Sequence, residues 1–227
     1  MPSRGAPHRV RLTRPAAPPI VVRMPPAGTV VYLNGIAASG KSTLARGLQA
    51  RWPEPYLHVG LDWITETMPR RFLFDGPDAD LGARWVTDGD GRLLRIDAGP
   101  YGERLLAGLP RLAAALARAG NHVIVDDVLL YPWRFADTAA ALAGLDAHLV
   151  EVRCDPETAR ARGRARNHGG GSGMTDAYYD AVYAHGDVDL RIDTGAEDPD
   201  ACAERLVAYL RSGAAPGAFG RFATAAG

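Results

Sequence analysis

A glycine-rich segment that carries one lysine is the strongest chemical signal in the sequence. Residues 35–42 read G-I-A-A-S-G-K-S and fit the pattern G-x-x-x-x-G-K-[ST] in full. Gly35 and Gly40 allow backbone torsions that side chains forbid, so the N–H groups of the loop can turn inward and surround phosphate oxygens. A helix that begins at Lys41 would add the positive end of its dipole. The segment therefore predicts a binding site for the phosphates of a nucleotide.

Lys41 stands out because it is the only lysine among the 26 basic residues of the chain. A compact ammonium on a thin stem can reach the β- and γ-phosphates where the planar fork of arginine fits poorly. The hydroxyl of Ser42 is expected to bind Mg²⁺ beside the phosphates. The predicted nucleotide-binding residues of this segment are Gly35, Ala38, Ser39, Gly40, Lys41, Ser42 and Thr43.

Two neighbouring acids follow an apolar run over residues 122–125. In nucleotide-binding folds an acid at the end of such a strand lies beside the Mg²⁺. Asp126 is the predicted residue on the metal side and Asp127 a predicted contact of the substrate, although the order could be reversed. The competing interpretation is that both acids only cap a helix or face solvent.

A third acid, Asp62, ends the second predicted strand and is followed by Trp63. Ligands bind at the carboxyl edge of a parallel sheet, so both residues are predicted to contact the acceptor substrate. A carboxylate opposite the γ-phosphate can accept the proton of an incoming hydroxyl, which makes Asp62 the predicted catalytic base. The alternative is that Asp62 caps a helix over residues 64–68.

Four arginines alternate along a predicted helix that starts after Asp155. Residues two apart on a helix lie on different faces, so only residues four apart can face one ligand. The pattern leaves two rival pairs open, Arg160 with Arg164 and Arg162 with Arg166. The glycines over residues 169–173 favour a hinge, and residues 155–174 are therefore predicted to form a lid.

Strands and helices alternate along the chain, which predicts a parallel sheet covered on both faces. The expected strands cover 29–34, 56–60, 122–126, 147–154 and 188–192, and the expected helices cover 41–51, 101–119, 133–142, 156–166, 175–184 and 199–211. The fold class is thus α/β, a three-layer sandwich with a five-stranded, mostly parallel sheet. Residues 69–99 are irregular, with a hairpin turn expected near Asp88.

Composition limits the class of protein. The 227 residues carry 26 basic and 26 acidic side chains, a balance that argues against nucleic acid as a partner. No apolar run is long enough to cross a membrane, and two cysteines are too few for a disulfide framework, so a cytoplasmic location is expected. Residues 1–27, rich in Arg and Pro, are predicted to be a disordered tail, 28–212 the folded domain, and 213–227 a loose end.

Several segments in this order resemble the chloramphenicol phosphotransferase family of P-loop kinases. The segments are Leu33-Asn-Gly, Ser39-Gly-Lys-Ser, Pro53-Glu-Pro-Tyr, Gly60-Leu-Asp-Trp, Met68-Pro, Val123-Ile-Val-Asp-Asp, Val152-Arg-Cys-Asp and Ile192-Asp-Thr. The likeness covers roughly residues 30–194. It departs after Arg166, where the family continues with Gly-Asp-Arg, and it is weak over residues 69–99, which would line the acceptor pocket.

The resemblance implies a kinase that uses ATP and Mg²⁺ to phosphorylate a drug hydroxyl. It places the base at Asp62, the lid arginines at Arg162 and Arg166, and Thr194 near the adenine. Arg162 and Arg166 are thus expected to be catalytic together with Lys41, because their charges would offset the negative charge that develops on the transferred phosphoryl group. The expected partner is thus a small-molecule hydroxyl acceptor, most simply an antibiotic of the chloramphenicol type, so that the chain would confer resistance. Alternatives are a nucleoside, sugar or nucleotide-sugar acceptor, or a nucleotide-binding regulator without an acceptor. The oligomeric state stays open, a homo-oligomer included.

Overall fold

Five strands form the central sheet in the order β2-β6-β1-β7-β8, and every neighbouring pair is parallel. The strands are β1 (Val30–Asn34), β2 (Tyr56–Gly60), β6 (His122–Asp127), β7 (Ala147–Arg153) and β8 (Leu190–Asp193). All five residues of β1 are buried, as expected for a central strand that has helices on both of its faces. The structure, a computed structural model, describes residues 25–91, 93–165 and 171–225.

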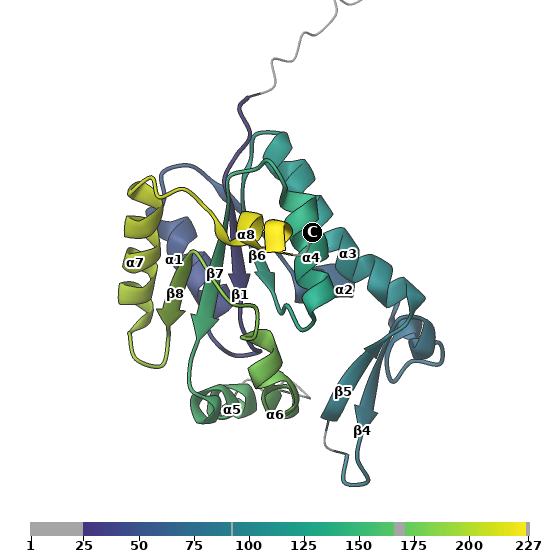
Figure 1. The fold of residues 1–227 in the computed structure, drawn as a ribbon. Helices are drawn as coiled ribbons and strands as arrows, with labels where there is room; N and C mark the ends of the chain where they lie inside the picture. Colours follow the sequence, from purple (N-terminus) through teal and green to yellow (C-terminus); the bar gives the residue numbers. More distant parts are fainter. Residues whose placement is uncertain (1–24, 92, 166–170, 226–227) are drawn as a thin grey trace, which may run out of the picture.

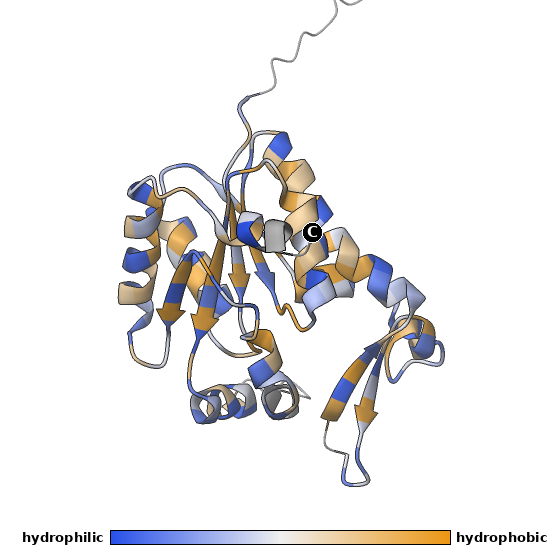
Figure 2. Cartoon of the chain, viewed as in Figure 1, coloured by the Kyte–Doolittle hydropathy of each residue, from blue (hydrophilic) through white to orange (hydrophobic). Residues whose placement is uncertain are grey.

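Helices cover both faces of this sheet, so the domain has three layers (Figure 1). On one face, α1 (Lys41–Arg51) and α7 (Pro199–Arg211) pack on apolar residues such as Leu33 and Ile192. On the other face, α3 (Pro100–Arg118) and α4 (Pro132–Leu142) cover Tyr32 and Val125. Figure 2 shows the apolar strands between helices whose outer sides are hydrophilic. The predicted fold class is confirmed.

Three further helices lie at the carboxyl end of the sheet, where the site is expected. α2 (Leu61–Glu66) follows β2 directly, and α5 (Pro156–Ala165) and α6 (Gly171–Val182) pack against each other at the end of β7. The Asp155 carboxylate accepts a hydrogen bond from the N–H of Thr158 at 2.9 Å and so caps α5. The predicted hinge falls partly on residues 166–170, which are outside the described ranges, while residues 171–173 begin α6.

The structure contains a small second sheet, of which only the hairpin turn was predicted. The segment that was expected to be irregular contains β3 (Leu73–Phe74), β4 (Ala83–Thr87) and β5 (Leu93–Ala98), with short 3₁₀ turns at Arg70–Phe72 and Ala79–Leu81. β4 and β5 are antiparallel and joined near Asp88, as the hairpin signal indicated. This arm projects from the body in Figure 1, and its β5 packs on α6. The hydroxyl of Tyr178 accepts a hydrogen bond from the N–H of Ile96 at 2.7 Å there.

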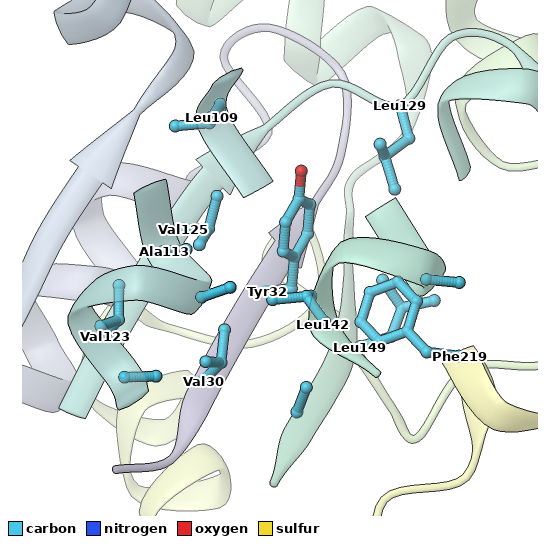
Figure 3. Close-up of a cluster of buried hydrophobic side chains, with 14 of the residues drawn as sticks. Val30, Tyr32, Leu109, Ala113, Val123, Val125, Leu129, Leu142, Leu149 and Phe219 are labelled. Carbon is cyan, nitrogen blue, oxygen red and sulfur yellow. The ribbon is translucent and has the colours of Figure 1, made fainter. Parts of the chain in front are cut away.

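The end of the chain differs from the loose segment that the sequence predicted. Residues Ala218–Ala225 form α8, and Phe219 is only 6% exposed. Its ring lies edge-on to Tyr32, with 5.7 Å between the ring centroids (Figure 3). Phe219 also contacts the ring of Phe135. The prediction was wrong because Gly and Ala dominate the local composition, whereas α8 is held by distant contacts: Ala218 and Phe219 are buried in the core, and the Asp189 carboxylate accepts hydrogen bonds from the N–H groups of Gly217 and Ala218.

Candidate active site

The glycine-rich loop joins β1 to α1 at the carboxyl edge of the sheet. Gly40 has φ +101°, in the left-handed region that favours glycine. At Gly35 a Cβ atom would lie 2.3 Å from the carbonyl oxygen of Val152, so no larger residue fits there. The hydroxyl of Ser39 is buried and has no hydrogen-bond partner among the described residues. An unpaired buried donor within such a loop fits an anion that accepts hydrogen bonds from it.

Lys41 lies across the opening of this loop. Its Nζ donates hydrogen bonds to the carbonyl oxygens of Gly35 at 2.8 Å and Ile36 at 3.0 Å, and the residue is only 6% exposed. The same ammonium lies 3.6 Å from a carboxylate oxygen of Asp126. A positive charge is therefore held at the centre of the loop, at the place where the sequence predicted contact with phosphates.

Asp126 and Ser42 face each other across the sheet edge, as predicted for a metal site. The Ser42 hydroxyl donates to the Asp126 carboxylate at 2.6 Å. Mg²⁺ binds through one or two protein oxygen ligands together with waters and substrate phosphates, so this pair fits Mg²⁺ chemically. Among the described residues there is no cluster of three or more His, Cys, Asp or Glu side chains that could hold a metal.

The groups around Asp126 keep its carboxylate ionised. Burial alone would raise the pKa of its carboxyl, but the Lys41 ammonium, followed by hydrogen bonds from His58 and Ser42, lowers the pKa to about 2. Asp126 is therefore ionised across the range in which enzymes normally work. An anion fixed beside the loop is what a divalent cation requires.

We expect this ionised carboxylate to stabilise the fold in a pH-dependent way. A pKa of about 2 in the folded chain, against an ordinary value of 3.8, corresponds to about 2 kcal/mol of unfolding free energy. Because the folded pKa is the lower one, this stabilisation is complete above about pH 5 and is lost between about pH 4 and pH 2. The unfolding free energies of the wild type and Asp126→Asn, measured with urea, should thus differ most near neutral pH and converge in acid. A difference that stays constant from pH 7 to pH 3 would contradict this assignment.

Asp62 and the loop residues line one cavity. The cavity measures about 550 Å³ and is bordered by Lys41, Ser42, Asp62, Trp63 and Asp126, together with Ala38, Gly40 and other residues. Asp62 lies in the first turn of α2 and is exposed. Its carboxylate makes no hydrogen bond or ion pair with any residue that the structure describes. An unpaired carboxylate that lines the same cavity as an ammonium is suited to accept a proton from a molecule bound there.

Asp127 does not fit its predicted role as a substrate contact. Its side chain is fully buried on the other side of the strand from Asp126 and forms an ion pair with Arg134, with 2.9 Å between nitrogen and oxygen. The Tyr32 hydroxyl donates to the same carboxylate oxygen at 2.5 Å. Both acids were candidates from the sequence because the sequence alone does not give the direction of either side chain at the end of β6. The alternation of side chains along the strand sends one acid to the cavity and the other into the core.

Arg162 is the predicted lid arginine that the structure describes, and it reaches the opposite side of the loop. Its guanidinium donates to the Thr194 hydroxyl at 2.9 Å and to the Thr194 carbonyl at 2.8 Å. Thr194 in turn donates to the carbonyl of Ser39 at 2.6 Å. Arg166, its predicted partner, lies outside the described residues. Arg160, from the rival pair, is held by Asp176 of α6 at 2.6 Å.

A second, smaller cavity opens at this side of the loop. It measures about 160 Å³ and is lined by Gly40, Thr43, Arg162 and Thr194, together with Glu197 and residues of α7. The two cavities share Gly40. The predicted nucleotide-binding residues are therefore divided between a cavity with Lys41 and one with Thr194.

His58 and Arg46 also line the larger cavity, and the sequence analysis did not select them. The His58 Nε2 lies 3.8 Å from the Asp126 carboxylate. His58 precedes Gly60 by two residues on β2, and Gly60 pairs in register with Asp126. Strand periodicity therefore carried the signal, since residues two apart on a strand share a face. No such signal was available for Arg46, whose place depends on how α1 packs.

The chain is similar in sequence to several known proteins. The profile of the family described as "Chloramphenicol phosphotransferase-like protein" matches residues 28–211. A Mycobacterium tuberculosis H37Rv protein described as "Putative O-phosphotransferase" is 24% identical over 209 residues, which is 86% of this chain and 88% of that protein. The adenylyl-sulfate kinase of Pseudomonas aeruginosa PAO1 is 28% identical over 192 residues, covering 81% and 85% of the two chains.

A solved structure shares the fold. The APS kinase of Mycobacterium tuberculosis, in complex with AMPPNP and APS, matches with a TM-score of 0.58 and 20% identity, over 82% of this chain and 99% of that one. In the part of the chain that the structure describes, no helix is long and apolar enough to span a bilayer.

Proposed function

The chain belongs to the chloramphenicol phosphotransferase-like family of small-molecule phosphotransferases, and we propose that it transfers the γ-phosphoryl group of ATP to a hydroxyl of an antibiotic of the chloramphenicol type. The observation that carries the proposal is the cavity of about 550 Å³ that is lined by both Lys41 and the unpaired Asp62. A phosphoryl donor and an alcohol can meet in such a space.

In the proposed reaction Asp62 accepts the proton of the acceptor hydroxyl. The acceptor oxygen forms a bond to the γ-phosphorus, the bond from that phosphorus to the β–γ bridging oxygen breaks, and ADP leaves. Lys41 and the inward N–H groups of the loop offset the negative charge that spreads over the phosphoryl oxygens. Phosphoryl transfer depends mainly on position and charge, so one aligned base and one aligned cation account for most of what the protein must provide.

Ser42 and Asp126 would hold Mg²⁺ in this reaction. The bound ion would neutralise charge on the β- and γ-phosphates and orient them. The oxygen-only donor pair, one of whose members is a carboxylate with a low pKa, supports this assignment.

The smaller cavity supports a site for the adenine. Thr194, at its wall, is the residue for which an adenine contact was predicted, and Arg162 from the lid lies against it. We therefore propose that Arg162 contacts the nucleotide near its adenine. A role for Arg166 on the phosphates remains a prediction.

The acceptor side is less polar than the phosphate side. Trp63 is 52% exposed at the cavity, and Leu61 and Val128 border it as well. An exposed indole offers a flat apolar surface to a drug-sized molecule. This surface favours an acceptor with an apolar part beside its hydroxyl, as an antibiotic of the proposed type has.

The test is an acceptor screen with ATP and Mg²⁺, in which mass spectrometry detects an added phosphate. The panel comprises chloramphenicol, other hydroxylated antibiotics, nucleosides and sugars. We expect the wild type to phosphorylate a hydroxylated antibiotic, with consumption of ATP that depends on this acceptor. Consumption of ATP at the same rate with and without every acceptor, and no phosphorylated product, would favour a nucleotide-binding regulator instead.

A further inference from the structure

A buried ion pair lies directly behind the proposed metal site, on the far side of β6. Asp127 is fully buried and Arg134 of α4 is 4% exposed, and their charged groups approach to 2.9 Å. Burial, followed by the charge of Asp127, raises the pKa of Tyr32 well above its usual range, so its hydroxyl stays a donor to this carboxylate. Two buried charges gain little net stability from each other, because desolvation offsets their attraction. Their geometric effect is therefore of more interest than their energy.

The pair fixes the main chain just after β6. The Asp127 carboxylate accepts from the N–H of Val128 at 2.7 Å, and the Arg134 guanidinium donates to the carbonyl of Val128 at 2.9 Å. One ion pair thus binds both polar groups of one peptide residue. Arg134 uses its two terminal nitrogens for two different acceptors, the Val128 carbonyl and the Asp127 carboxylate, and the planar guanidinium thereby defines orientation as well as distance.

The next residue is fixed in the same way by side chains from other elements. The N–H of Leu129 donates to the side-chain oxygen of Asn34 at 2.9 Å, and its carbonyl lies 2.5 Å from the Nε2 of His185. Asn34 also donates to the carbonyl of Val182 at the end of α6. The main chain over Val128 and Leu129 therefore has all four of its polar groups bound by buried or half-buried side chains.

This rigid segment adjoins the cavity on its other side. Val128 lines the cavity, and Asp126, two residues before it, carries the carboxylate that meets Ser42 at 2.6 Å. Because successive side chains of a strand point to opposite faces, anchoring Asp127 in the core also sets the direction of Asp126. A shift at the anchor would move the carboxylate away from Ser42.

From this geometry we infer that Arg134 is a positioning residue for the metal side of the site: through Asp127 and Val128 it holds the Asp126 carboxylate where it and Ser42 can bind Mg²⁺ together. The inference rests on the proposed function for the identity of the metal. It assigns Arg134 no contact with substrate, since the side chain is buried behind the strand. Residues that orient metal ligands typically change metal affinity about 10- to 100-fold when they are replaced.

The experiment measures the affinity of a fluorescent ATP analogue with EDTA and then over a Mg²⁺ titration. Arg134→Lys keeps the charge but loses the two donors of the guanidinium. In this variant, the Mg²⁺ concentration that gives half of the maximal change in affinity for the ATP analogue should rise at least 10-fold. The affinity in EDTA should stay within about twofold of the wild type, because the loop and Lys41 are untouched. Arg111→Met is the matched control: Arg111 also forms an ion pair with a residue of α4, Asp137, but at the surface, so the Mg²⁺ response should not change.

A second variant separates positioning from stability. Asp127→Leu combined with Arg134→Met removes both charges together, so neither charge is left buried and unpaired. Tyr32 and Val128 lose hydrogen-bond partners in this variant, so its urea unfolding is measured first to show that it is folded. This double variant should show the same weakened Mg²⁺ response as Arg134→Lys. A wild-type Mg²⁺ response in either folded variant, or an equal loss of affinity in EDTA and in Mg²⁺, would overturn the inference and leave the pair a purely structural one.

The readout is independent of the acceptor. If no acceptor is phosphorylated but nucleotide binding responds to Mg²⁺, the proposed function fails and the test of Arg134 still stands. If nucleotide binding by the wild type does not respond to Mg²⁺, the metal site and its positioning residue both fail.

Discussion

Replacing Asp62 with asparagine should reduce the turnover of phosphoryl transfer by about 10²- to 10⁴-fold, the usual contribution of a general base. Asparagine has nearly the same shape but cannot accept the proton of the acceptor hydroxyl. Asp62 has no partner among the described residues and lies in the first turn of an exposed helix, so the substitution should not disturb the fold. The affinity for ATP should stay close to that of the wild type, because the nucleotide is held on the other side of the cavity. Steady-state kinetics with the acceptor from the screen, together with nucleotide titrations, measure both quantities.

Glu66→Gln is the matched control for this change. Glu66 is an exposed acid at the end of the same helix and does not border the cavity. It should keep wild-type turnover. Full turnover in Asp62→Asn would show that another group removes the proton, and the base would then have to be sought among the remaining walls of the cavity.

Replacing Lys41 with arginine should lower kcat/KM for ATP by about 10²- to 10³-fold, although the formal charge is unchanged. The ammonium fits between two carbonyl oxygens of the loop at 2.8 and 3.0 Å, and the residue is almost fully buried. A planar guanidinium is too wide for this position and presents its donors in a different geometry. Unlike the change at Asp62, this substitution should weaken nucleotide binding as well as turnover.

The reverse exchange of the two cationic side chains, at another position of α1, is the control. Arg51→Lys exchanges the two cations at the far end of that helix, where Arg51 pairs with the exposed Asp200. Surface changes of this kind usually alter stability by less than about 0.5 kcal/mol, and we expect no change in kinetics. If Lys41→Arg were as active as the wild type, a bare positive charge would be sufficient, and the fit of the ammonium to the loop would have no role.

The sequence predicts the central fold well because its signals are local. β1 is a continuous apolar run followed by a glycine loop, and both the strand and the helix after it are found where they were expected. The closeness of Ser42 and Asp126 could also be predicted from the sequence, since Ser42 belongs to the loop motif and Asp126 ends a strand. The regions that the sequence described poorly are those whose structure depends on distant contacts. The small sheet of the arm packs on α6, and α8 packs on Tyr32 and Phe135.

The two acids at the end of β6 illustrate the same limit within the site. They are adjacent in sequence and chemically identical, yet one faces a cavity and the other a buried guanidinium. Which of them faces the cavity, where we propose the metal site, depends on the face that α4 presents to the strand. No composition or spacing rule contains that information, because Arg134 itself gives no hint in the sequence that it is buried.

The single lysine has a practical consequence for studying this protein. Reagents that acylate primary amines find no other side chain to react with in this sequence, because every remaining basic residue is an arginine or histidine. Acetylation at that one position would neutralise the cation of the loop without altering the surface. Lys41 is 6% exposed and bound to two carbonyl oxygens, so its acylation, read by mass spectrometry, reports on how often this one side-chain amine opens to solvent.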